Sequence, residues 1–476
     1  MAFKIVVFAA YALVILVIGV MGLRKTRSFV DYFLGGRNVG PWMTAFTYGT
    51  AYFSAVLFIG FAGKVGWGFG YSALWIMVGN AFLGVMAVWW FVGPRVSRLS
   101  REMNVHTMSE LLEKRYDSPF LKLFSSISIF IFFIPYSAAV FIGLSYLFRT
   151  NFNMDYTLSL ILMGTFTAVY LVLGGYKSMT MIDVFFGIVM CAGVVILLVS
   201  TLKAGHGVER ITASLAAVDP KLIRWVGPPG LWPLFSLVFL TSVAPFAMPQ
   251  LIQKFYAIRD KKAIRIGMIA STGFAVLCVG VAYFTGATAR LFLTPDNAPG
   301  AFSNGAPVFD AVMPEFIDKV VPPSLSVLIL LLILAASMST LAALVLISSS
   351  SVAKDIYAGF IKKDVSDRRL TLLMRITSAF FVLLSVVLAY LKPASIVAIL
   401  GISWGAIGSV FLGPFLWGLF WKGANRIGAI ASAVLALTAC VGLYASGMPS
   451  PQAGTIGMMV SLVVLPPVSL IFKRRR

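Results

Sequence analysis

The sequence predicts an all-α integral membrane protein with about 13 transmembrane helices. Of its 476 residues, 59% are hydrophobic and only 12% are charged, and the mean hydropathy is +0.94. The apolar residues form repeated runs of roughly 20 residues, the length of helix that crosses the hydrocarbon layer of a bilayer. These runs lack the alternation of barrel strands, so a membrane β-barrel is excluded.

Thirteen apolar runs are long enough to be read as spans, with edges uncertain by several residues. They cover 2–23, 41–63, 71–93, 123–148, 156–173, 183–202, 231–250, 266–288, 324–352, 371–391, 394–421, 427–446 and 454–472.

Two of these spans carry signals of a broken helix. The span at 41–63 is polar in its first half, around Thr50 and Ser54, and the span at 231–250 contains Pro245 and Pro249. Broken backbone is tolerated in a membrane only where protein or a cavity covers it, and it exposes carbonyl groups to ions. For the first of these spans, a close-packed helix interface is the alternative.

The two irregular spans are five apart, which fits a five-plus-five inverted repeat in which each repeat begins with a broken helix. The whole chain, 1–476, then forms a single transmembrane domain. Within it, 1–40 is an extra span with an inner loop, 41–202 and 231–421 are the repeats, and 427–476 holds the last spans and a basic tail.

The charge distribution predicts an orientation. The formal net charge is +21, but the basic residues lie at the ends of apolar runs, where they indicate topology and not nucleic-acid binding. Of the 38 Lys and Arg residues, 28 fall on one side of the predicted membrane. Because positive loops stay in the cytoplasm, we expect a multi-pass protein of the cell (inner) membrane with its N-terminus outside and its tail, 473–476, inside.

Few residues suit metal or covalent chemistry. Cys191, Cys278 and Cys440 lie in apolar runs without CxxC spacing, and His106 and His206 lie in loops. The spans contain no nucleophile–base or metal-ligand constellation, so we expect a protein that is not an enzyme.

Hydroxyl groups interrupt the apolar run at 324–352. Ser339 and Thr340 lie in its middle, where an unpartnered hydroxyl is costly. Oxygen ligands at the bilayer midplane suit a hard monovalent cation, although Ser and Thr also serve as ordinary packing residues between helices. Asp183, at the start of the span 183–202, is either a helix cap or a functional carboxylate. Thr107 followed by Glu110 has capping-box spacing and predicts a short surface helix.

Four segments resemble the sodium:solute symporter family, which contains proline, pantothenate, sugar, sialic acid and monocarboxylate carriers. They are 31–41, 107–117, 174–183, and 335–340 followed by 354–357, and the resemblance runs from Asp31 to about Ala431. It implies a two-repeat transporter core, alternating access, and a sodium site between the broken span and the span 324–352.

The resemblance also implies roles for individual residues. Sodium ligands would be the backbone carbonyls of Thr50, Phe53 and Ala336 with the hydroxyls of Ser339 and Thr340, while Asp183 would lie on the ion-release path. The positions that approach substrate in relatives are Ser54, Ala55, Tyr136, Thr241 and Trp404.

One sodium ion per cycle is expected. Relatives that bind a second sodium have hydroxyls two and three residues beyond the Thr340 position, where this chain has Ala342 and Ala343.

The expected function is sodium-coupled symport of a small carboxylate-bearing metabolite: a monocarboxylate, pantothenate, or an amino acid such as proline. Proline-type relatives have an Asp where this chain has Tyr52. The residue pattern of 50–60 is closer to that of pantothenate-type members. The alternatives are a sugar-type symporter, a passive channel or a membrane solute sensor. Because the chain stops at Arg476, without a kinase or receiver domain, we expect a transporter. The expected partners are sodium, a small solute and the lipid bilayer, without nucleic acid or an obligatory protein partner.

Overall fold

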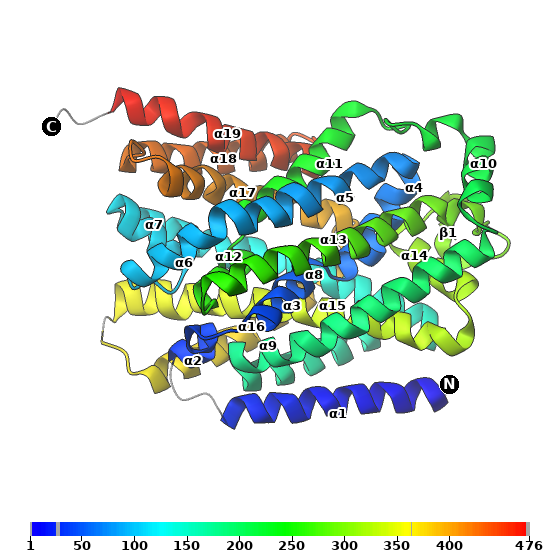
Figure 1. Ribbon diagram of the computed structural model, residues 1–476, viewed down its shortest axis with the longest axis horizontal. Coiled ribbons are helices and arrows are strands. Elements are labelled where there is room, and N and C mark those ends of the chain that lie inside the picture. The colour runs from blue at the N-terminus through cyan, green and yellow to red at the C-terminus, as the bar shows by residue number, and fades with distance from the viewer. Residues whose placement is uncertain (1, 25–28, 363, 473–476) are drawn as a thin grey trace.

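The computed structural model describes residues 2–24, 29–362 and 364–472, and most of its helices run along one common direction (Figure 1). Ten helices among the described residues are long and apolar enough to cross a membrane, and two shorter apolar helices cover Val6–Met21 and Tyr156–Ala168. The prediction of an all-α membrane protein is confirmed. The predicted number of thirteen spans is not confirmed, because breaks shorten some helices and neighbouring pieces join into longer ones. The basic tail, 473–476, lies outside the described residues.

The bundle consists of long helices and of pieces that follow one another along the same path. They are α1 (Ala2–Arg24), α3 (Pro41–Tyr52), α4 (Trp67–Phe69), α5 (Leu74–Gly79), α6 (Gly93–Glu102), α8 (Pro119–Phe152), α9 (Tyr156–Ala204), α11 (Leu231–Val243), α12 (Pro249–Ala257), α13 (Lys261–Thr288), α15 (Pro323–Ser350), α16 (Asp367–Leu391), α17 (Ile396–Phe420), α18 (Arg426–Ala445) and α19 (Ser450–Ile471).

Short elements lie at both ends of the bundle (Figure 1). One end, here called the α7 end, carries α2 (Phe29–Leu34) and α7 (Met108–Tyr116). The other, called the α14 end, carries α10 (Val208–Val218), α14 (Phe309–Val320) and the antiparallel pair β1 (Phe302–Ser303) and β2 (Ala306–Pro307).

The first predicted break is present. Helix α3 stops because Phe53 adopts an extended conformation (φ −113°, ψ 136°), and the chain resumes at Val56 as a wide π-helical segment, η2 (Val56–Gly66). The hydroxyl of Ser54 accepts a hydrogen bond from the Val56 N–H (3.2 Å) and so caps the second piece. The backbone of two residues, Phe53 and Ser54, is therefore released from regular helix in the middle of the bundle.

The second predicted break is also present. Helix α11 ends at Val243, a short 3₁₀ turn covers Ala244–Phe246, and α12 begins at Pro249. Pro249 has no N–H to donate and therefore favours a new helix start at this position. The two broken helices meet directly, since the Tyr52 hydroxyl donates to the Thr241 carbonyl at 2.6 Å.

Helix α15 is the centre of the bundle. About 94% of its most apolar stretch is buried, compared with 33% for α16 and α18. It continues as a π-helical segment, η9 (Ser351–Ile361), so that 39 residues form one path. At 1.5 Å per residue this path is about 58 Å long, which is longer than the roughly 30 Å of hydrocarbon in a bilayer.

The sequence predicts a loop at 174–182, and this prediction is wrong. Helix α9 runs through it, interrupted only at Gly175 (φ 63°, ψ −177°). A side chain at this position would lie 2.6 Å from the ring of Tyr32, so only glycine fits both the backbone conformation and the space. A single residue thus makes the bend for which the sequence predicts a longer loop.

The predicted short helix is confirmed as α7. The Thr107 hydroxyl accepts from the Glu110 N–H (3.1 Å), as in a capping box. The Glu110 carboxylate, however, accepts from the backbone N–H of His106 (2.8 Å). The reciprocal bond is therefore made one residue before the cap.

Candidate functional site

Buried oxygen atoms converge where the break after α3 faces the middle of α15. The Thr340 hydroxyl oxygen lies 3.3 Å from the carbonyl oxygens of Ala51 and Phe53, and 3.1 Å from that of Ala336. A hydroxyl donates one hydrogen at a time, so it can satisfy only one of these three carbonyls. Such a surplus of acceptors suits a hard cation, which prefers oxygen ligands.

A second pair of hydroxyls extends this group. Ser339 donates to the Thr50 hydroxyl (2.8 Å), which donates to the Phe46 carbonyl (2.8 Å). Thr50, Ser339 and Thr340 are all fully buried. We call the oxygens of Thr50, Ala51, Phe53, Ala336, Ser339 and Thr340 the oxygen cluster.

Most of the expected sodium ligands lie in this cluster. The carbonyls of Phe53 and Ala336 and the hydroxyls of Ser339 and Thr340 are brought together. Thr50 contributes its hydroxyl, whereas the carbonyl next to Thr340 is that of Ala51, which the sequence did not indicate. Periodicity alone does not tell which carbonyls a helix break will turn toward its neighbour.

Ser337 holds the broken helix in place. Its hydroxyl donates to the Ile333 carbonyl within α15 (2.6 Å) and accepts from the N–H of Ala55 (3.0 Å). This contact satisfies a backbone N–H that the break leaves without a helical partner. Ser337 is therefore a positioning residue that sequence reasoning missed.

Asp183 lies next to the oxygen cluster. Its carboxylate is fully buried and faces the hydroxyls of Thr47, Thr50 and Ser339 and the ammonium of Lys254. Because α9 runs on both sides of it, Asp183 does not cap a helix. It is thus a carboxylate inside the bundle and close to the candidate ion site.

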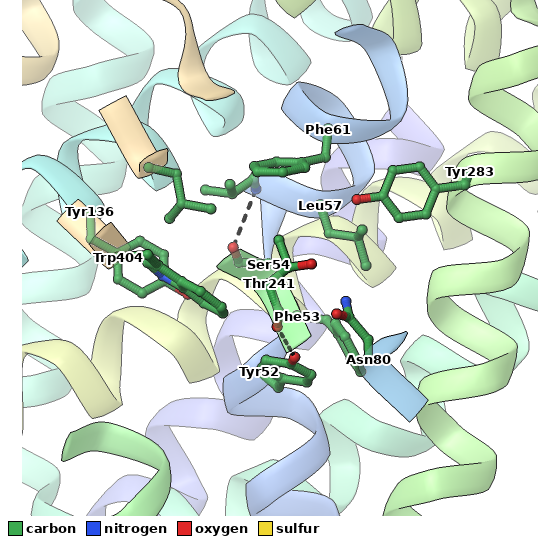
Figure 2. A pocket seen from close by; sticks show the side chains of 12 residues that line it. Tyr52, Phe53, Ser54, Leu57, Phe61, Asn80, Tyr136, Thr241, Tyr283 and Trp404 are labelled. Carbon is green, nitrogen blue, oxygen red and sulfur yellow. Dashed lines mark hydrogen bonds between the residues drawn. The ribbon is translucent and has the colours of Figure 1, made fainter. Parts of the chain in front are cut away.

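A small pocket lies on the other side of the break (Figure 2). Its volume is about 40 Å³, which is little more than the space of one water molecule in liquid. None of its twelve described lining residues carries a charge. They are Tyr52, Phe53, Ser54, Val56, Leu57, Phe61, Asn80, Tyr136, Thr241, Tyr283, Leu400 and Trp404.

Aromatic rings form one side of this pocket. Tyr52 stacks on Trp404 (6.0 Å between ring centroids), and Tyr136 meets the same indole edge to face (5.9 Å). Rings in such contact are stiff apolar surfaces with polar tips. This side can therefore hold the apolar body of a small solute.

Four of the five expected substrate positions line the pocket: Ser54, Tyr136, Thr241 and Trp404. Ala55 does not. A side chain added at Gly143 would come within 2.9 Å of its methyl group, so Ala55 packs toward α8.

Asn80 and Tyr283 are pocket residues that sequence reasoning missed. The Asn80 carbonyl oxygen accepts from Ser242 (3.0 Å), which leaves its NH₂ group available. Figure 2 shows the Tyr283 hydroxyl and the Asn80 amide directed toward the middle of the lining residues. Asn80 is the one amide in the apolar run 71–93, a signal that could have found it.

A larger cavity, which we call the vestibule, opens at the α14 end. It has a volume of about 780 Å³, and Lys64, Leu237 and Val397 are among its lining residues. On α11, Leu237 of the vestibule precedes Thr241 of the pocket by about one helical turn. On α17, Val397 of the vestibule likewise precedes Leu400 of the pocket by about one turn. The vestibule therefore lies along two of the helices that line the pocket, nearer to the α14 end.

Hydrogen bonds join several segments at the α7 end. Arg37 donates to the carbonyls of Ser100 (3.2 Å) and Val105 (2.7 Å). The Thr107 hydroxyl donates to the Asp355 carboxylate (2.6 Å), which joins α7 to the end of the α15 path.

The two broken helices, with a pocket and an oxygen cluster at their breaks, define the class of transporters built from inverted five-helix repeats. A substrate-bound, outward-open sodium-coupled sialic acid symporter has the same fold. Its TM-score is 0.84, with 20% identity, covering 99% of this chain and 98% of that one. A nucleobase-cation-symport-1 family transporter in a closed conformation matches more distantly (TM-score 0.55, 12% identity, covering 92% and 93%).

The chain belongs to the sodium:solute symporter family, whose model matches residues 32–436. It is 28% identical to the high-affinity proline transporter PutP of Bacillus subtilis over 432 residues, 88% of each protein. It is 29% identical to the sodium/pantothenate symporter of Escherichia coli over 441 residues, which is 90% of this chain and 87% of the relative.

Proposed function

We propose that this chain is a secondary active transporter, and not an enzyme, that couples one sodium ion to the uptake of a small carboxylate-bearing metabolite. The observation that carries this proposal is the double role of Phe53. Its carbonyl oxygen belongs to the oxygen cluster, and its side chain lines the pocket. Sodium and solute would thus act on the same short stretch of broken backbone, which is a direct route for coupling.

Sodium is the proposed coupling ion because the cluster offers neutral oxygens in a buried place, and because a relative is a sodium/pantothenate symporter. One ion per cycle is proposed because Ala342 and Ala343 supply no side-chain oxygen beyond Thr340. Asp183, beside the cluster, is the proposed acid on the ion-release path.

A carboxylate-bearing solute is proposed on the charges and donors of the pocket. The lining residues contain no acidic group to hold an ammonium, and Tyr52 stands where proline-type relatives have an Asp. The free NH₂ of Asn80 and the hydroxyl of Tyr283 can donate to a carboxylate. Lys64, in the vestibule, would attract an anion toward the pocket. A monocarboxylate or pantothenate fits these features better than proline.

The proposed mechanism is alternating access in the cell (inner) membrane. With the N-terminus outside, the vestibule at the α14 end faces the exterior, and the hydrogen bonds at the α7 end would close the cytoplasmic side. The repeats, 41–202 and 231–421, would move against each other around the two breaks. Opening of the α7 end then requires the hydrogen bonds of Arg37 and Thr107 to break.

The first experiment identifies the solute. Purified full-length protein is heated with a panel of monocarboxylates, pantothenate, amino acids and sugars, each with and without sodium. A bound solute raises the apparent stability by mass action, and we expect the largest shift for a carboxylate in the presence of sodium. A sugar that gives the largest shift would favour a sugar-type symporter instead.

The second experiment measures coupling in proteoliposomes with the solute identified in this way. One sodium moving with a monocarboxylate anion transfers no net charge, so we expect uptake that an inside-negative potential does not accelerate. Strong acceleration would contradict an anionic solute with single-sodium coupling. Binding without sodium-driven uptake would favour a sensor.

A further inference from the structure

Lys254 is a fully buried lysine whose ammonium has no hydrogen-bond partner among the described residues. It lies on α12, just after the second helix break, and its Nζ is 4.9 Å from the centroid of the Tyr176 ring on α9. A lysine inside a membrane protein is costly unless an opposite charge compensates it. The face of Tyr176 attracts a cation but carries no net charge.

The compensating charge is Asp183. Asp183 attracts Lys254 through space, although the two groups form no ion pair within 4.0 Å among the described residues. The same carboxylate faces the hydroxyls of Thr50 and Ser339 in the oxygen cluster. Two buried, oppositely charged groups thus lie near each other beside the candidate sodium site.

We propose that the Lys254 ammonium is a tethered cation that neutralises Asp183 and takes the place of a second bound cation. The proposal rests on the proposed function, in which one sodium ion is coupled to solute uptake, and it explains why only one ion is bound. A carboxylate next to an oxygen cluster attracts cations. With Lys254 beside it, the pair adds no net charge, so the cluster binds one sodium through neutral oxygens, while the fixed ammonium repels a further ion.

Two features of α15 agree with this arrangement. Ala342 and Ala343 are buried and add no side-chain oxygen to α15 beyond Thr340. A tethered ammonium needs no such ligands, because its position is fixed by the protein chain. The two alanines and the buried lysine thus favour the same ion number.

The test measures sodium binding to purified full-length protein without any solute. Thermal stability is followed against sodium chloride at constant ionic strength, with choline chloride as the balance, for the wild type and for Lys254→Met, Lys254→Arg, Asp183→Asn and the double variant Asp183→Asn/Lys254→Met. The slope of the stabilisation free energy against the logarithm of the sodium concentration gives the number of ions bound. We expect a slope of about one ion for the wild type and Lys254→Arg, and a clearly steeper slope for Lys254→Met, where the carboxylate is free to hold a second ion.

The Asp183→Asn variant leaves the ammonium uncompensated next to the cluster, so its sodium midpoint should rise by about tenfold or more. In the double variant both charges are gone, and the midpoint should return toward the wild-type value. Such non-additivity is the signature of a direct coupling between two residues. If Lys254→Met does not fold, the coupling between Lys254 and Asp183 is tested by comparing the sodium midpoints of Asp183→Asn and the double variant.

The inference is overturned if Lys254→Met keeps the wild-type midpoint and the wild-type slope, or if the double variant binds sodium no better than Asp183→Asn. A sodium response that all variants share overturns this inference alone. A wild type that sodium does not stabilise at all overturns the proposed function and the inference together.

Discussion

At the scale of single residues, the unusual feature is the ratio of acceptors to donors around Thr340. Three carbonyl oxygens lie within 3.3 Å of one hydroxyl that has a single hydrogen to give. A packing role needs only one such contact, and the bond to Ala336 within the helix would be enough. The convergence of the other two carbonyls from the broken helix is what favours an ion site.

We expect Thr340→Ala and Ser339→Ala to raise the sodium concentration needed for uptake by about tenfold or more. Each removes an oxygen ligand, and a contact to a charged group is typically worth about 1.5–3 kcal/mol. The measurement is the sodium dependence of uptake. Thr377→Ala is the matched control, because its hydroxyl bonds only its own helix, at the Leu373 carbonyl. Unchanged sodium dependence in both test variants would show that these two hydroxyls only pack between helices and do not bind sodium.

The sequence could indicate Thr340 and Ser339 because hydroxyls stand out in an apolar run. It could not indicate the roles of Ser337 or Tyr52 in the same way. Ser337 bonds a backbone N–H 282 positions away in the chain, and Tyr52 bonds a carbonyl 189 positions away. Such partners are chosen by tertiary packing, about which local patterns say nothing.

At the scale of helices, the two breaks could be predicted because prolines and dense small polar residues weaken a helix locally. The sequence predicts where α9 is interrupted but predicts a loop there. The structure has a single glycine with positive φ at this place. The π-helical segments η2 and η9 had no sequence signal that we recognised. Their wide turns depend on how the neighbouring helices pack.

Ser337→Ala tests how the first break is held. The substitution leaves the buried Ala55 N–H without its acceptor, which should lower the free energy of unfolding by about 1–3 kcal/mol. The thermal midpoint of the purified protein should fall accordingly. Ser385→Ala is the control, because that buried hydroxyl bonds only the Phe381 carbonyl of its own helix. Equal midpoints for the two variants would contradict the role of Ser337.

The junction of α7 with the α15 path predicts a pH dependence. Burial raises the pKa of the Glu110 carboxyl, but the hydrogen bonds from His106 and the positive charge of Lys354 outweigh it and lower the pKa from 4.5 to about 2. A carboxyl whose pKa is lower in the folded protein stabilises the fold above its ordinary pKa. That contribution is lost as the pH falls from about 4.5 toward 2.

Glu110→Gln should therefore lose part of the stability that the wild type has at about pH 6, and the difference between the two should shrink as the pH falls below about 4.5. Thermal midpoints across this range provide the measurement. The exposed Glu102, paired with Arg98 on α6, supplies the control Glu102→Gln, for which we expect little change. A difference that stays constant with pH would contradict the assignment.

At the scale of the whole molecule, the proposed orientation rests on the uneven distribution of basic residues. It predicts that the α6–α7 connection is cytoplasmic and that the segment before α10 is external. Single cysteines at Asn104 and Gly207, in a protein in which Cys191, Cys278 and Cys440 are replaced, should react with an impermeant reagent from opposite sides of the membrane. Reaction of both from one side would refute the topology.

The contrast between the vestibule and the pocket also has a consequence for water. At about 30 Å³ per molecule, the 780 Å³ vestibule has room for roughly 25 water molecules, whereas the 40 Å³ pocket has room for about one. In the proposed alternating-access cycle, this water would leave one end and water would enter the other. The transport cycle is therefore also a hydration cycle, and the activity of water becomes a variable that sets the balance between its states. A large neutral osmolyte that cannot enter the vestibule would favour whichever state holds less water, without touching either the ion site or the solute.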